Sequence, residues 1–136
     1  MATISGKCLC GGISYESDNE PMFTANCHCS DCRAATGAAY STLSFFKSDD
    51  VKISGETKSY QHVADSGSQM IKRFCPNCGS QLFGENSARE GMISVRAGTI
   101  DQVEMVKPAR NVYCGSKIPS TPLDPELPAS EKMPEA

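Results

Sequence analysis

The sequence has no tryptophan, only two histidines and no apolar run long enough to serve as a signal peptide or to cross a bilayer. We therefore expect a cytoplasmic protein without a membrane partner. The net charge is −3, and lysine and arginine are scattered along the chain rather than clustered. A nucleic-acid surface needs a basic stripe to neutralise phosphates. We therefore expect no nucleic-acid partner.

The abundant residue is cysteine, with eight in a chain of 136 residues. This length is typical of a single domain with one core. In a reducing compartment, cysteine clusters bind metal or take part in catalysis more often than they form disulfides. The cysteine count therefore predicts metal sites.

Short alternating or β-branched runs between turn signals predict an all-β domain. The candidate strands are residues 3–8, 12–17, 40–46, 51–54, 58–63, 70–74, 80–85 and 92–98. In the last of these, Ile93, Val95 and Ala97 alternate with Ser94 and Arg96, which predicts one buried face.

A single segment is predicted to be helical. Ser30 is a candidate cap for a short helical turn through DCRAAT, and Gly37 stands where such a helix would end. From residue 119 the chain is rich in proline, with five of the eight prolines in 119–136. We expect a domain over 1–118 and a tail over 119–136 that lies over the domain or is disordered. A docking motif for an adaptor domain is the alternative.

The motif CPNCGS begins at Cys75 and resembles a metal knuckle, in which two thiolates flank a tight turn. Such a knuckle needs two further ligands, and CLCGG supplies them as Cys8 and Cys10. Together with Cys78 these residues predict a closed four-thiolate zinc site. The alternative is that Cys75 and Cys78 form a thioredoxin-type redox pair. The sequence favours metal binding, because the residues after the motif continue as a strand rather than a helix. Four thiolates can also hold iron.

The motif CHCSDC supplies Cys27, Cys29 and Cys32 but no obvious fourth ligand. His28 lies between two of the cysteines, and we expect its side chain to point elsewhere. Cys114 is expected to be a small buried residue. His62 is expected to be a surface residue of a strand.

The fourth position of this second site is therefore predicted to be open. Structural zinc sites are closed, whereas catalytic ones keep three protein ligands and one exchangeable position. Such a site would accept water, a carbonyl oxygen or a substrate thiolate, and it would lower the pKa of a bound thiol.

Four motifs together resemble a known family: GKCLCGGISYE, CHCSDCRAATG, RFCPNCGSQLF and SVRAGTID. In order and spacing they are similar to the motifs of the glutathione-dependent formaldehyde-activating enzyme (GFA) family, which includes centromere protein V. The similarity covers residues 3 to 119. Asn111 and Cys114 depart from the pattern, because the family usually has a histidine and an apolar pair in this region.

The resemblance implies a small zinc-binding β-tent of antiparallel sheets with two zinc ions per chain. It implies a structural zinc on Cys8, Cys10, Cys75 and Cys78, and an open zinc on Cys27, Cys29 and Cys32. It also implies addition of the glutathione thiol to formaldehyde, which gives S-hydroxymethylglutathione and is formally a carbon–sulfur lyase reaction in reverse.

We therefore expect a zinc enzyme that acts on a thiol adduct of an aldehyde, with glutathione as one candidate thiol. Arg33, Tyr40 and Arg96 are candidate neighbours for the substrate. The alternative is a non-catalytic zinc module for protein–protein interaction, which would require a fourth ligand at the second site.

Overall fold

The computed structural model describes residues 3–133, which form two β-sheets and one α-helix, α1 (Ser30–Thr36). The strands are β1 (Ile4–Lys7), β2 (Ser14–Ser17), β3 (Phe23–Cys27), β4 (Ser41–Lys47), β5 (Val51–Ser54), β6 (Lys58–Val63), β7 (Gln69–Phe74), β8 (Gln81–Asn86), β9 (Met92–Arg96) and β10 (Arg110–Val112). Short 3₁₀ turns lie at Ser48–Asp50, Ala97–Thr99, Val103–Met105 and Cys114–Ser116. The predicted all-β class is confirmed.

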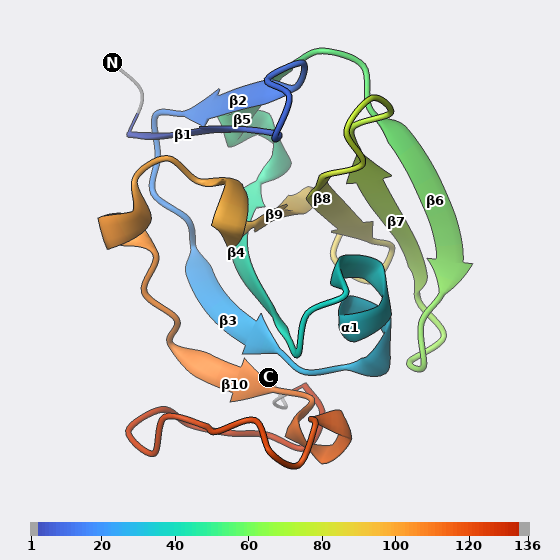
Figure 1. The fold of residues 1–136 in the computed structure, drawn as a ribbon, viewed down its shortest axis with the longest axis vertical. Helices are drawn as coiled ribbons and strands as arrows, with labels where there is room; N and C mark the ends of the chain where they lie inside the picture. Colours follow the sequence, from blue (N-terminus) through green and yellow to red (C-terminus); the bar gives the residue numbers. More distant parts are fainter. Residues whose placement is uncertain (1–2, 134–136) are drawn as a thin grey trace.

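The strands form a small sheet of order β1-β2-β5 and a large sheet of order β10-β3-β4-β9-β8-β7-β6. Neighbouring strands of the described chain are antiparallel, except that β10 runs parallel to β3. The small sheet lies at the top of Figure 1, and the large sheet curves below it from β3 and β10 to β6 and β7. Helix α1 follows β3 directly in the chain and is drawn between β4 and β7 in Figure 1.

The main core joins the two sheets. Tyr15 of β2 packs edge-on against Phe83 of β8, with ring centroids 5.3 Å apart. Other members of this buried cluster are Ile4, Ile13, Phe46, Leu82, Ile93, Val95, Ala97 and Ile100. Cys8 and Cys75 belong to the same cluster. The first group of cysteines therefore lies where the two sheets meet.

Helix α1 begins at Ser30, the predicted cap, so the actual cap lies one residue earlier. The N-cap is Cys29, whose Sγ accepts a hydrogen bond from the backbone N–H of Cys32, and Ser30 is the first helical residue. The expectation for Ser30 was therefore wrong, because a thiolate-forming side chain takes the role usually given to a hydroxyl. Gly37 ends the helix in the left-handed conformation, with φ 72°, as predicted.

Two strands were not predicted from the sequence. In β3, apolar Phe23, Ala25 and Cys27 alternate with polar Thr24 and Asn26, so a strand signal was present over these five residues although no strand was predicted there. Strand β10 has only three residues, which is too short for an alternating pattern to indicate a strand. The eight predicted runs coincide with the remaining strands.

The described part of the proline-rich tail lies against β10. The backbone N–H of Asn111 donates to the carbonyl of Pro128, and the N–H of Ser130 donates to the carbonyl of Asn111. The division between domain and tail at residue 118 stays a prediction. None of the helices formed by residues 3–133 is long and apolar enough to cross a membrane.

Candidate metal centres

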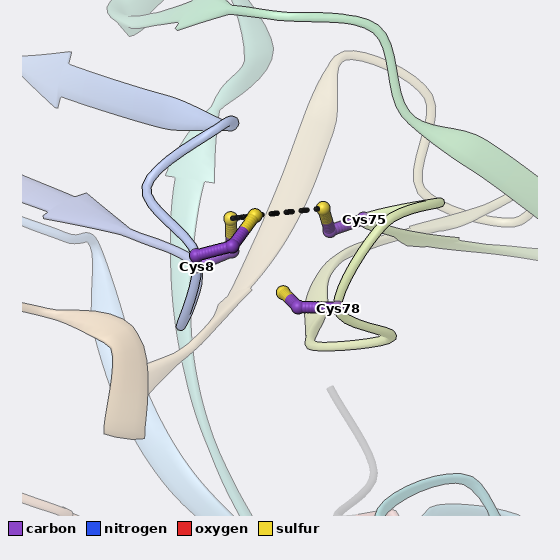
Figure 2. Close-up of side chains that lie close together, drawn as sticks. Cys8, Cys75 and Cys78 are labelled. Carbon is purple, nitrogen blue, oxygen red and sulfur yellow. Dashed lines mark hydrogen bonds between the residues drawn. The ribbon is translucent and has the colours of Figure 1, made fainter.

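The first cluster brings together Cys8, Cys10, Cys75 and Cys78, whose Sγ atoms all lie within 4.8 Å of one another. Figure 2 shows the sulfurs of the two loops pointing toward a common centre. Sγ of Cys10 lies 3.6 Å from Sγ of Cys8 and 3.7 Å from Sγ of Cys75. Tetrahedral zinc with Zn–S bonds of about 2.3 Å places its sulfur ligands ~3.8 Å apart. These two separations match a tetrahedral zinc site, and the four thiols are close enough together to hold one ion.

The loop after β1 directs backbone N–H groups at two of these sulfurs. The N–H of Ile13 donates to Sγ of Cys8 at 3.3 Å, and the N–H of Gly12 donates to Sγ of Cys10 at 3.4 Å. The side chain of Asn77 and the N–H of Gly12 lower the pKa of Cys10. Such donors stabilise the thiolate form that a metal requires.

The knuckle between β7 and β8 completes the site. Gly79 adopts φ 77°, and its N–H donates to the carbonyl of Cys75 at 2.9 Å, which closes the tight turn. The hydroxyl of Ser80 lies 3.2 Å from Sγ of Cys78 and lowers the pKa of that thiol to about 5. Ser80 Oγ also accepts a hydrogen bond from the N–H of Leu9, which links the two loops directly.

The second cluster consists of Cys27, Cys29 and Cys32, whose Sγ atoms also lie within 4.8 Å of one another. Cys27 is the last residue of β3, Cys29 caps α1, and Cys32 lies in its first turn. Cys27 and Cys32 are buried, and Cys29 is half-buried. The change from strand to helix thus turns three sulfurs inward within six residues.

Arg96 is the cationic partner of this cluster. Its Nη1 lies 3.9 Å from Sγ of Cys32 and donates to Oγ of Ser41 at 2.7 Å. Hydrogen bonds from Cys27 and Cys29, followed by the charge of Arg96, lower the pKa of Cys32 to about 3. Alternation along β9 placed Arg96 opposite the buried face, yet it is 7% exposed. It is buried because its guanidinium lies between Cys32 of α1 and Ser41, the first residue of β4.

His28 and Cys114 lie outside both cysteine clusters. His28 is 1% exposed, its Nε2 lies 3.3 Å from Oδ1 of Asn111, and its ring packs against Tyr40 with centroids 4.8 Å apart. Cys114 is half-buried, and its backbone N–H donates to the carbonyl of Ser130 in the tail. Cys114 was expected to be a small buried residue and is only half-buried, because the chain reaches the surface at Gly115 and Ser116. The second cluster has three protein sulfurs and gains no fourth ligand from the described residues.

His62 is not the surface residue that was predicted. Its side chain is 19% exposed; Nε2 lies 2.7 Å from Nζ of Lys72, and Nδ1 lies 3.9 Å from a carboxylate oxygen of Asp31. The sequence missed this Asp31–His62–Lys72 chain because its members come from α1, β6 and β7. Arg33 of α1 has a buried Nε without a hydrogen-bond partner, and it is not among the residues that line the cavity described next.

The two clusters differ in whether they border a cavity of about 1040 Å³. Cys27, Cys29 and Cys32 all line this cavity. None of the four cysteines of the first cluster is among the described residues of its wall. Asp31 and Lys72 line it as well, and Met133 from the tail borders it.

The fold and the clusters define a small all-β protein with two cysteine groups that can each hold a metal ion. The family model described as glutathione-dependent formaldehyde-activating enzyme matches residues 3–116, and the chain belongs to this family. The predicted resemblance is thereby confirmed.

Among solved structures, the chain is similar to a Rhodobacter sphaeroides protein known from a crystal structure. The two share 18% sequence identity with a TM-score of 0.58, over 76% of this chain and 96% of that one. At this identity the similarity shows the fold alone. None of the curated proteins matches the chain.

Proposed function

We propose that this protein is a zinc-dependent enzyme of the carbon–sulfur lyase type, which forms and cleaves the thiol adduct of an aldehyde. Cys8, Cys10, Cys75 and Cys78 would hold a structural zinc ion, and Cys27, Cys29 and Cys32 would hold a second one with an open position. Glutathione and formaldehyde are the pair that the family description indicates. A reducing compartment such as the cytoplasm would keep the eight cysteines, all free in the structure, as thiols.

The observation that carries the proposal is the position of the three-cysteine cluster in the wall of the cavity. A small molecule in this cavity can reach the sulfurs, whereas a structural site needs no access. Zinc at three thiolates supplies a mild Lewis acid and a place for a further sulfur ligand. The guanidinium of Arg96 beside Cys32 offsets the net negative charge that three thiolates leave on the ion.

The reaction needs one proton transfer for each carbon–sulfur bond. When the thiol sulfur adds to the carbonyl carbon, the carbonyl double bond becomes a single bond and the thiol proton moves to the oxygen. Asp31 and Lys72 both line the cavity and are linked through His62. These side chains offer a carboxylate and an ammonium group that can accept and return the proton.

The test is a measurement of exchange between glutathione, formaldehyde and their adduct by magnetization-transfer NMR on the zinc-loaded protein. We expect the protein to accelerate exchange, Cys29→Ser to abolish the acceleration, and Cys114→Ser, a control cysteine outside both clusters, to retain it. Equal exchange with and without wild-type protein would contradict the proposal for this substrate pair.

A further inference from the structure

The cavity beside the three-cysteine cluster is larger than formaldehyde requires. Its volume of about 1040 Å³ is at the upper end of the ~300–1,000 Å³ typical of sites for drug-sized ligands. Formaldehyde has two heavy atoms, so most of the cavity must receive the remainder of the substrate. The chemistry of its wall therefore indicates what that remainder is.

The register of β3 and β4 shows how the wall runs away from the cysteines. On the face of β3 and β4 that borders the cavity there are three successive cross-strand pairs. They are Cys27 with Ser41, Ala25 with Leu43, and Phe23 with Phe45. Alternate residues of a strand share a face, and four residues span about 13 Å. The Phe23 and Phe45 rings stack at the far end, with centroids 4.5 Å apart and planes inclined by 16°. An apolar track therefore leads from the cysteine cluster to an aromatic pair.

Other elements widen this apolar wall. The further apolar residues that line the cavity are Met70, Met92, Val112, Tyr113 and Met133. Phe23, Leu43 and Phe45 are only half-buried, so the protein itself does not cover them fully. Methionine side chains adapt to ligands of irregular shape, and a contiguous apolar surface of this kind marks a binding site.

The charged residues of the wall do not by themselves identify the substrate. Four are acidic and four are basic: Asp31, Asp65, Glu85 and Glu131, with Lys72, Arg89, Arg110 and Lys132. Lys132 is already paired with Asp65 at 3.3 Å, and the guanidinium of Arg89 lies 5.9 Å from the centre of the Phe45 ring. Glu85 is likewise paired with Arg73, at 3.0 Å. Glutathione carries two carboxylates and one ammonium group, so the charges of this wall neither select nor exclude it, and the apolar track carries the inference.

We propose that the site prefers thiols with an apolar, ring-bearing arm, and that this arm lies along Ala25 and Leu43 and reaches the Phe23–Phe45 pair. The inference rests on the proposed function, because it places the thiol sulfur at the three-cysteine cluster. Formaldehyde or another small aldehyde would occupy the remaining space beside Asp31 and Lys72. Each buried methylene of the arm is expected to tighten binding about fourfold.

The test uses full-length protein with cobalt in place of zinc and measures thiol affinity from the change in its visible spectrum. We expect 4-phenylbutane-1-thiol to bind at least about tenfold more tightly than 4-hydroxybutane-1-thiol, which has the same thiol and the same chain length. Phe45→Ala should reduce this ratio severalfold, because only the phenyl thiol carries a ring that reaches the aromatic pair. Leu43→Ala should weaken the binding of both thiols, because both place their butane chain along Leu43. Tyr60→Ala, an aromatic residue that is 64% exposed and lies on β6, is the matched control and should keep the ratio.

The outcomes separate the inference from the proposed function. If glutathione or the hydroxyl thiol binds as tightly as the phenyl thiol, the proposed preference for an apolar arm is wrong. The proposal of an open position at the three-cysteine site is not affected by that result. The same holds if the ratio survives in Phe45→Ala, or if Leu43→Ala weakens the binding of neither thiol. If none of these thiols changes the spectrum, the open site itself is wrong and the proposed function falls with it.

Discussion

The two cysteine clusters have similar chemistry but opposite surroundings. The four-cysteine cluster joins loops that are far apart in the chain, since Cys10 and Cys75 are separated by 65 positions. It lies at the junction of the two sheets and shares their core. The three-cysteine cluster comes from six consecutive residues and lines a cavity. The comparison teaches that loop closure and contact with a cavity, more than ligand type, distinguish the two clusters, and we expect the same two features to separate their roles.

The largest effect is expected at the four-cysteine site. Cys75→Ser should give unfolded or insoluble protein, because structural zinc contributes an apparent ~10–16 kcal/mol and a whole domain has a stability of only ~5–15 kcal/mol. Circular dichroism and thermal melting check this, with Cys114→Ser as the control. A Cys75→Ser protein that has the wild-type spectrum and Tm would show that this cluster does not hold the sheets together.

The comparison predicts a different result for Cys29→Ser. This variant should stay folded, because serine can replace the Cys29 sulfur as helix cap and the metal here closes only a short loop. We expect it to lose one zinc ion per chain and all zinc-dependent activity, as measured by elemental analysis and the exchange assay. Collapse of the kind expected for Cys75→Ser would make both sites structural and remove the difference between them.

A smaller effect, confined to one site, is expected for Arg96→Gln. Loss of the guanidinium near Cys32 and Ser41 should weaken the second zinc site about 10- to 100-fold. Competition with a chromophoric chelator measures the two affinities separately. Arg73→Gln is the control, since Arg73 pairs with Glu85 and not with a cysteine. If Arg96→Gln weakens both sites equally, the residue acts on overall stability and not on the second site.

The smallest effect concerns the core next to the four-cysteine site. Burial raises the pKa of Tyr15 to about 12, and its hydroxyl lies 2.7 Å from Oγ1 of Thr99. The folded state favours the neutral phenol of Tyr15. The contribution of this side chain to the free energy of unfolding is therefore complete below pH ~10, the pKa of an unperturbed tyrosine. That contribution is lost as the pH rises from ~10 to ~12, by up to about 1.4 kcal/mol per pH unit.

Urea unfolding of wild type and Tyr15→Phe from pH 8 to 12 tests this account of the core. Near pH 8 the variant should be less stable by about 1 kcal/mol, the value of one hydrogen bond. Above pH 10 the difference should shrink and then reverse, because phenylalanine cannot ionise. Parallel pH profiles for the two proteins would show that the Tyr15 hydroxyl is not sequestered from solvent.

Sequence reasoning predicted the parts that depend on local spacing. Alternation in β9 and the β-branched runs predicted eight strands, and the grouping of the cysteines followed from short motifs. The cavity could not be predicted in this way, because its wall combines six strands of the large sheet, from β10 to β7, with Met133 of the tail. Neither could the burial of Arg96 or the His62–Lys72 contact, since both depend on long-range packing.

The most direct test of the account is zinc-edge X-ray absorption of the protein loaded with two zinc ions per chain. The seven cysteine sulfurs of the two clusters should be accompanied by one oxygen or nitrogen ligand per pair of ions. We predict that adding a binding thiol replaces this lighter ligand with sulfur, and that the change is absent in Cys29→Ser. A sulfur-only spectrum before thiol is added, or a nitrogen ligand that persists at saturating thiol, would show that the second site is closed.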